Sequence, residues 1–130
     1  MKTFDVIALG ELNVDLILNR IAGFPEVGKE IFARDMICTL GSSTAIFAAN
    51  VSALGARTAF AGMIGRDAFG ELVRGSLEAR GVDTRYVIEA ADRATGVTVV
   101  MSYGEDRANV TYPGAMEALR FADLDPEIFL

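Results

Sequence analysis

Residues 40–70 read LGSSTAIFAANVSALGARTAFAGMIGRDAFG, and this order of turns and apolar runs decides the fold. Residues 44–54 are apolar over most of a helix circumference, so the sequence predicts a helix that is buried on most sides. Any of Ser42, Ser43 and Thr44 could cap its first turn, because a hydroxyl oxygen there accepts a hydrogen bond from a free N–H. The stretch therefore begins with a polar turn that leads into an apolar helix.

The second half of this stretch predicts a buried strand. Residues 58–64 are mostly apolar and bounded by glycines, which is typical of a strand covered on both faces in a parallel sheet. Asp67 is then placed to cap a second helix, and Gly81 follows the end of that helix pattern. Residues 4–9 predict another parallel strand, and Gly10 marks its carboxyl end, where open α/β sheets place their ligands.

Five further segments have the composition of β-strands. Residues 14–18 alternate as expected for a strand with two different faces, and residues 30–39 form a second extended run. Residues 96–102 and 107–112 flank a turn and predict a hairpin. Residues 86–88 predict one short strand more. The sequence thus predicts an α/β protein with two β-rich, alternating regions.

The composition is that of one globular domain. The chain has 130 residues, and 52% of them are apolar, which is enough for a hydrophobic core. Its net charge is −6 and its 12 Lys and Arg residues are scattered, so it has no basic stripe to hold a nucleic-acid backbone. Neither nucleic acid nor an anionic membrane is expected as a partner.

Membrane insertion and secretion are not expected either. The first apolar run is interrupted by Asp5 and Glu11, so no targeting segment is expected. Residues 45–65 carry a single charge, Arg57, but their polar residues and glycines fit a helix, turn and strand better than one membrane span. The single cysteine, Cys38, cannot form an internal disulfide, which fits a reducing cytoplasm. We expect it to be a buried thiol in a strand.

Several kinds of catalytic site are missing from this sequence. It has no histidine, which excludes Ser-His-Asp and Cys-His nucleophile systems and histidine metal sites within these residues. Neither G-x-G-x-x-G nor G-x-x-x-x-G-K-[ST] occurs, so the dinucleotide-binding motif and the phosphate-loop motif are also missing.

A series of short motifs resembles the first half of the ribokinase-like (PfkB) carbohydrate kinases. The motifs are GELNVD, the GSST turn before an apolar helix ending in LGA, AGMIGRDAFG, LEARGVDT, TGVTVV and YPGA. Each motif alone is a weak signal. Their order and spacing over nearly the whole chain carry the resemblance.

The resemblance implies a ribokinase-like α/β fold. This fold is a doubly wound, mostly parallel sheet, present here in part, with helices on its faces and a small β lid over the substrate. The core would comprise residues 1–12, 40–90 and 113–130, and the lid would comprise residues 13–39 and 91–112. Pairing of two lids would give a homodimer.

The resemblance also implies a reaction, which is transfer of the ATP γ-phosphoryl group to a hydroxyl of a sugar or nucleoside. The complete protein would use ATP and Mg²⁺ as cofactors, with a monovalent cation as an open question. The G-x-G-D motif that carries the general base and the anion hole in this family does not occur in this sequence. We therefore assign no catalytic or metal-binding residue here and expect the 130-residue chain alone to be inactive. The alternative is a non-catalytic α/β module for sugar binding or assembly.

The resemblance assigns substrate contacts to seven residues: Asn13, Asp15, Gly41, Ser42, Ser43, Thr98 and Val100. A carboxylate such as Asp15 suits a sugar, since its two oxygens accept from neighbouring hydroxyls. Without the resemblance, Asp15 would be interpreted as a solvated surface group. Ser43 could equally serve as a helix cap, and the two hairpin residues could simply pack.

Two departures from the family pattern concern the substrate. Ser42 stands where the family has the second glycine of a pair. Ile46 stands where many sugar-specific members have asparagine, and this removes one donor and one acceptor from the pocket. The identity of the sugar or nucleoside, ribose included, therefore stays open.

Overall fold

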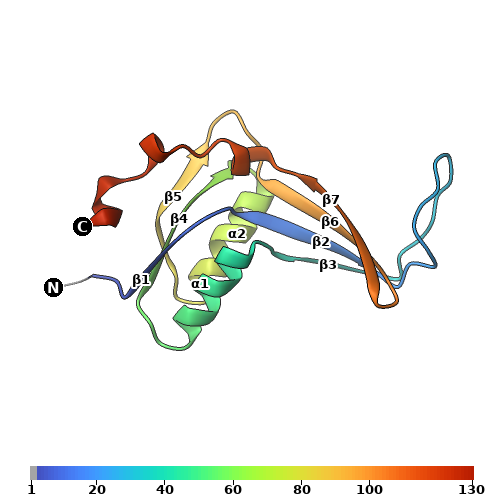
Figure 1. Cartoon of the computed structure of the whole chain (residues 1–130), viewed down its shortest axis with the longest axis horizontal. Coiled ribbons are helices and arrows are strands. Elements are labelled where there is room, and N and C mark those ends of the chain that lie inside the picture. The colour runs from blue at the N-terminus through green and yellow to red at the C-terminus, as the bar shows by residue number, and fades with distance from the viewer. Residues whose placement is uncertain (1–2) are drawn as a thin grey trace.

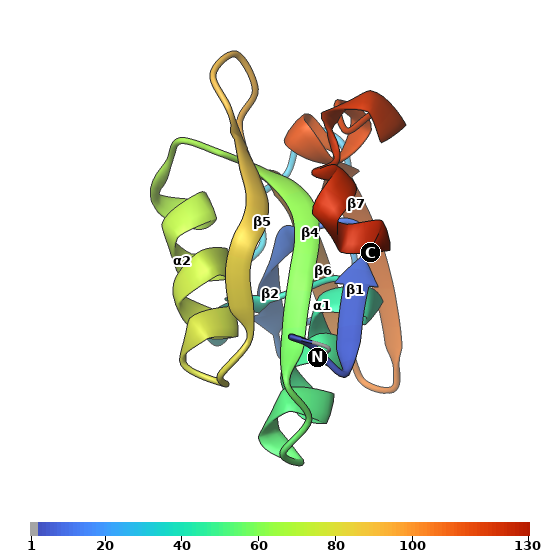
Figure 2. The ribbon, with the colours of Figure 1, turned by 90° about the vertical axis from the view of Figure 1, so that its left-hand side faces the viewer.

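The computed structural model describes residues 3–130, which form two β-sheets and two α-helices (Figure 1). β1 (Val6–Leu9), β4 (Thr58–Gly65) and β5 (Asp83–Ala90) form the first sheet, which is parallel and has the strand order β1-β4-β5. Both helices, α1 (Ser43–Ala53) and α2 (Ala68–Glu78), lie behind this sheet in Figure 2. The predicted α/β class is confirmed.

The second sheet runs out to one side of the first (Figure 1). Its strands are β2 (Asn13–Asn19), β3 (Asp35–Leu40), β6 (Gly96–Tyr103) and β7 (Asp106–Tyr112), in the order β3-β2-β6-β7. β2 pairs in parallel with β6, and the two outer pairs are antiparallel. All four strands come from the two β-rich regions that the sequence predicted, although one of them is shorter than expected.

The hydrophobic core lies between the first sheet and the helices. β4 is buried at every position, and α2 contacts strands of both sheets. The core residues are Ala8, Leu12, Val14, Ala45, Ala48, Phe60, Ile64, Val73, Leu77, Val82 and Val87. Within residues 3–130, no helix is both long and apolar enough to cross a membrane.

Most predicted strands are present, with shifted ends. The predicted strand 58–64 is β4, and the predicted hairpin is β6 and β7. The strand predicted at 86–88 extends over all of β5, because β4 offers it a parallel partner along that length. The run predicted at 30–39 is a strand only in β3, because its partner β2 ends at Asn19, which pairs with Asp35.

The burial of α1 differs from the prediction. The helix predicted at 44–54 is present, but only its alanine side, formed by Ala45, Ala48 and Ala49, is buried. Ile46 is 44% exposed and Phe47 is 52% exposed. The expectation of a helix buried on most sides is therefore wrong. β1 and β4 cover the alanine side, while no element within residues 3–130 covers the opposite side.

Cys38 also differs from the prediction. It lies in a strand, as expected, but its side chain is exposed. β3 is an edge strand of the second sheet, and its neighbour Met36 on the same face is 65% exposed. The interpretation of Cys38 as a buried core thiol is therefore wrong, because nothing among the described residues packs over that face of β3.

Candidate functional site

Four of the seven predicted substrate residues meet where β2 begins and β3 ends. Asn13 is buried, and its Nδ2 donates hydrogen bonds to Thr98 Oγ1 at 3.0 Å and to Asp15 Oδ1 at 3.3 Å. Gly41 N donates to the Asn13 carbonyl at 2.9 Å. We call these four residues, Asn13, Asp15, Gly41 and Thr98, the Asn13 cluster. It joins β2, β6 and the turn before α1 through hydrogen bonds.

Gly41 allows its backbone to approach two oxygens of the cluster. A Cβ atom at this position would lie 2.5 Å from Asp15 Oδ1 and 2.7 Å from Asn13 Oδ1. Both distances are well inside van der Waals contact, so any side chain would displace the carboxylate and the amide. The glycine is therefore required by the packing of the cluster.

Two acceptor oxygens of the cluster remain available. Asp15 Oδ1 accepts the bond from Asn13, whereas no residue within 3–130 donates to Asp15 Oδ2 or to Asn13 Oδ1. Asp15 is half-buried, so its carboxylate is partly shielded from water. A ligand with adjacent hydroxyl groups could donate to these oxygens, and hydrogen bonds to a charged acceptor are the stronger kind.

Ser42 adopts a backbone conformation that favours glycine. Its φ is +68° and its ψ is 122°, a sparsely populated combination that costs an L-residue about 1–3 kcal/mol. Its Oγ accepts a hydrogen bond from Ala45 N at 3.4 Å, so Ser42 is the N-cap of α1 among the three candidate hydroxyl residues. The conformation accounts for the expectation of glycine at this position.

The other two predicted residues lie outside the Asn13 cluster. Ser43 is exposed at the first position of α1. Val100 is buried and lies two residues beyond Thr98 on the same face of β6, opposite Ile17 of β2. The structure therefore gathers Asn13, Asp15, Gly41 and Thr98, and it leaves Ser43 and Val100 at the margin.

A cavity of about 610 Å³ lies beside Asp15. β2 and β3 line one side, and α1 and the end of α2 line the other; the residues include Asp15, Thr39, Ile46, Asn50 and Arg80. Ile46 gives this cavity an apolar wall. Thr39 is paired with Asp15 across β2 and β3, whereas Asn50 and Arg80 arrive only through helix packing. Sequence reasoning missed Thr39, Asn50 and Arg80, and also Ser76, which lines the same cavity. The predicted extended run 30–39 includes Thr39, but nothing in the sequence placed any of these four residues at a cavity.

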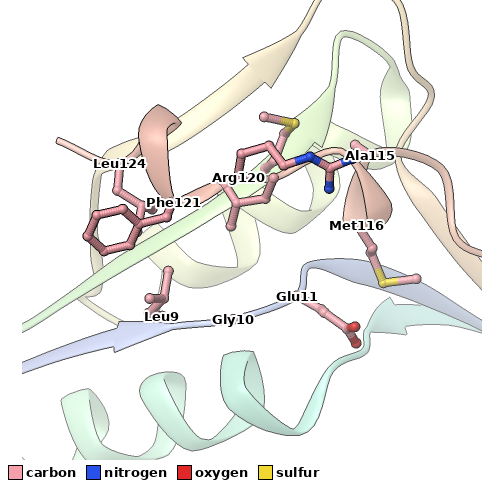
Figure 3. A pocket seen from close by; sticks show the side chains of 10 residues that line it. Leu9, Gly10, Glu11, Ala115, Met116, Arg120, Phe121 and Leu124 are labelled. Atoms are coloured by element: carbon pink, nitrogen blue, oxygen red, sulfur yellow. The ribbon is translucent and has the colours of Figure 1, made fainter.

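A second cavity, of about 320 Å³, lies at the carboxyl ends of β1 and β4 (Figure 3). The chain after β7, including the short turns η1 (Gly114–Glu117) and η2 (Phe121–Asp123), covers it. In Figure 3 the side chains of Leu9, Phe121 and Leu124 gather at one end, with Glu11 and Arg120 away from them. Its lining is mainly apolar and contains none of the seven predicted residues. The cavity beside Asp15 is the better candidate for a ligand with hydroxyl groups.

The described residues do not fit a metal site. Within residues 3–130, no group of three or more aspartate, glutamate or cysteine side chains is placed to hold a metal ion. Mg²⁺ is held in proteins by carboxylate oxygens, water and substrate phosphates. We assign no Mg²⁺ ligand among these residues.

Comparison with known proteins gives one family and a consistent set of folds. A family model described as pfkB family carbohydrate kinase matches residues 3–129. An uncharacterized sugar kinase from Pyrococcus horikoshii is 26% identical with a TM-score of 0.79, over 95% of this chain and 40% of that one. A Halothermothrix orenii fructokinase is 27% identical with a TM-score of 0.79, over 96% and 42%.

A third structure holds ligands. Arabidopsis thaliana ribokinase, solved with ribose and ATP, is 28% identical with a TM-score of 0.77, over 88% of this chain and 37% of that one. No match is found among curated protein sequences. The chain thus spans about two fifths of the length of these solved kinases. Its fold is ribokinase-like, as the sequence predicted.

Proposed function

Because the chain belongs to the PfkB family of carbohydrate kinases, we propose that it is the substrate-binding amino-terminal part of an ATP-dependent sugar or nucleoside kinase. The observation that carries the proposal is the Asn13 cluster beside the 610 Å³ cavity. The second sheet, with residues 13–39 and 91–112, would serve as the lid. Residues 1–12, 40–90 and 113–130 would belong to the core.

The cluster has the chemistry that a polyhydroxylated ligand needs. Asp15 offers a carboxylate, Asn13 an amide oxygen and Thr98 a hydroxyl, which already contacts the Thr111 hydroxyl at 2.9 Å. Gly41 lets the backbone stand close to the same oxygens. Asp15 would accept hydrogen bonds from two neighbouring sugar hydroxyls. Ile46 leaves the identity of the substrate open, because the wall that it forms offers no hydrogen bond, so ribose is not favoured over other sugars or nucleosides.

The chain supplies one side of the reaction. Phosphoryl transfer depends on positioning the acceptor hydroxyl and on stabilising charge by donors and Mg²⁺. The described residues provide the positioning, and no G-x-G-D motif occurs in the sequence. We use "complete protein" for this chain together with the second half that its solved relatives contain. ATP, Mg²⁺ and any monovalent cation would therefore bind to residues of that second half.

The isolated chain of 130 residues is expected to release no ADP from ATP with any sugar. The physical reason is that it lacks a general base and an anion hole. A coupled ADP assay on the purified chain, with the complete protein as the positive control, checks this. Sugar-dependent ADP release by the isolated chain would contradict the proposal. If the gene encodes no G-x-G-D after Leu130, a non-catalytic sugar-binding or assembly module replaces the kinase.

We also propose a homodimer that forms through the second sheet. The face opposite Asp15 carries exposed apolar side chains from both edge strands: Met36 at 65%, Val110 at 62% and Tyr112 at 56%. Pairing two such faces across a twofold axis would cover both of them. Light scattering of the complete protein is expected to give twice the chain mass, and Val110→Lys is expected to give the monomer. A wild-type protein that stays monomeric at high concentration would contradict the dimer.

A further inference from the structure

Asp67 and Thr95 tie the beginning of β6 to the core. Thr95 is fully buried, and its Oγ1 donates to Asp67 Oδ1 at 2.7 Å while it accepts from Gly65 N at 2.9 Å. Thr95 N donates to Asp67 Oδ2 at 2.8 Å. Asp67 Oδ1 also accepts from Gly70 N at 2.8 Å, which is the N-cap bond of α2. We call Gly65, Asp67, Gly70 and Thr95 the Asp67 clamp.

The clamp leaves no room for side chains at its two glycines. A Cβ at Gly65 would lie 2.5 Å from Arg93 O and 2.6 Å from Thr95 N. A Cβ at Gly70 would collide with Gly65 O and lie 3.0 Å from Thr95 Oγ1. Both glycines of the stretch GRDAFG therefore permit the close approach of the segment before β6. The stretch does more than begin a helix.

The chain that leaves β7 lies beside the segment that leads into β6. Ala115 N donates to Ala94 O at 2.8 Å, directly before Thr95. Gly114, with a φ of +52°, has no room for a Cβ against Ala94 O. The first residue of β6, Gly96, would meet Pro113 O at 2.7 Å if it carried a Cβ. The two ends of the β6–β7 hairpin are therefore fixed at one crossing, and the clamp holds that crossing to β4 and α2.

We infer that Asp67 is a positioning residue for the sugar site. It fixes the beginning of β6, and β6 is the strand on which Thr98 contacts Asn13. The inference rests on the proposed function for its substrate. Pairing of β6 with β2 begins at Gly96, one residue after the clamp, and reaches Thr98 opposite Asp15. A shift of the first residues of β6 therefore moves the Thr98 hydroxyl relative to the Asn13 amide.

The charge of Asp67 suits this role. Partial burial alone would raise its pKa, but hydrogen bonds from the Thr95 hydroxyl and from the N–H groups of Thr95 and Gly70 outweigh burial and lower the pKa. The carboxylate is therefore ionised at neutral pH and accepts all three bonds. In Asp67→Asn, one oxygen becomes an NH₂ group, so at least one of these donors loses its acceptor.

The test compares four variants in the complete protein. We expect Asp67→Asn and Thr95→Val to raise KM for the sugar by roughly tenfold to a hundredfold, with KM for ATP nearly unchanged, because a misplacement of about 1 Å has effects of this size. Thr95→Ser keeps the hydroxyl and is expected to restore the wild-type sugar KM. Arg66→Ala is the matched control, since Arg66 lies inside the same motif but, among residues 3–130, pairs only with exposed Glu89, at 3.5 Å.

Hydrogen exchange separates this inference from the proposed function. In Asp67→Asn, amides of β6 and β7 are expected to exchange faster while those of β4 and β5 keep their protection. An unchanged sugar KM, or equal loss of protection in both sheets with both KM values altered, would overturn the positioning role. If the wild-type protein phosphorylates nothing, the proposed function fails. In that case the exchange pattern alone tests whether the Asp67 clamp holds β6. Unchanged protection of the β6 amides in Asp67→Asn would overturn this role of the clamp.

Discussion

Asp15→Asn is expected to lower the specificity constant of the complete protein for its sugar by roughly tenfold to a thousandfold. The substitution keeps the size and shape of the side chain but removes the charge that strengthens two hydrogen bonds. Each hydrogen bond to a charged group is worth about 1.5–3 kcal/mol net, and the variant loses the charge-assisted part of two such bonds. Nucleotide affinity is expected to change little, because no described residue is assigned to ATP.

The measurement is a comparison of kcat/KM for the sugar and of ATP affinity in the wild type and the variant. Asp35→Asn is the matched control, since Asp35 lies in the same sheet but pairs with Arg20, at 2.7 Å, at the far end of β2 and β3. Asp35→Asn is expected to leave kcat/KM unchanged. An unchanged kcat/KM for Asp15→Asn as well would show that Asp15 is only a surface carboxylate.

Gly41→Ala is expected to reduce kcat/KM for the sugar by about a hundredfold, because the new Cβ forces the Asn13 cluster apart. That Cβ would lie 2.5 Å from Asp15 Oδ1 and 2.7 Å from Asn13 Oδ1, so both oxygens must move by a substantial part of an ångström. The overpacking is also expected to lower the free energy of unfolding by about 1–3 kcal/mol.

The control for this prediction is Gly23→Ala. Apart from Gly23 itself and its two chain neighbours, no residue within 3–130 has an atom within 4 Å of the position that its Cβ would take, and its φ lies outside the left-handed region. Gly23→Ala is expected to leave both kcat/KM and the melting temperature near the wild-type values. A Gly41→Ala protein that keeps its sugar kcat/KM would contradict the close approach in the cluster, and one that loses ATP affinity equally would indicate general damage to the fold.

The elements that sequence reasoning predicted correctly carry their signals locally. β4 is mostly apolar, and Asp67 followed by a helix pattern ending before Gly81 marks both ends of α2. The wrong predictions concern the burial of side chains, which depends on residues that are distant in the sequence. α1 is apolar over most of its circumference, yet only its alanine side is buried. Cys38 has the composition of a core residue but lies on an uncovered edge strand.

The site shows the same division between local and distant information. Resemblance to a family placed Asn13, Asp15, Gly41 and Thr98 in one site, and the structure brings them together through hydrogen bonds. Pattern alone linked none of them, because Asn13 and Thr98 are 85 residues apart. The second role of Asp67 escaped sequence reasoning for the same reason. Its cap bond to Gly70 is local, whereas its bonds to Thr95 span 28 residues.

The central claim is that the Asn13 cluster holds a sugar or nucleoside for phosphorylation. ADP release by the complete protein, measured with ATP against a panel of sugars and nucleosides, tests it most directly. We expect at least one compound to raise ADP release well above the rate with ATP alone, and we expect Asp15→Asn to remove most of that increase. Binding of a sugar without any increase in ADP release across the panel would contradict the kinase and favour a non-catalytic module.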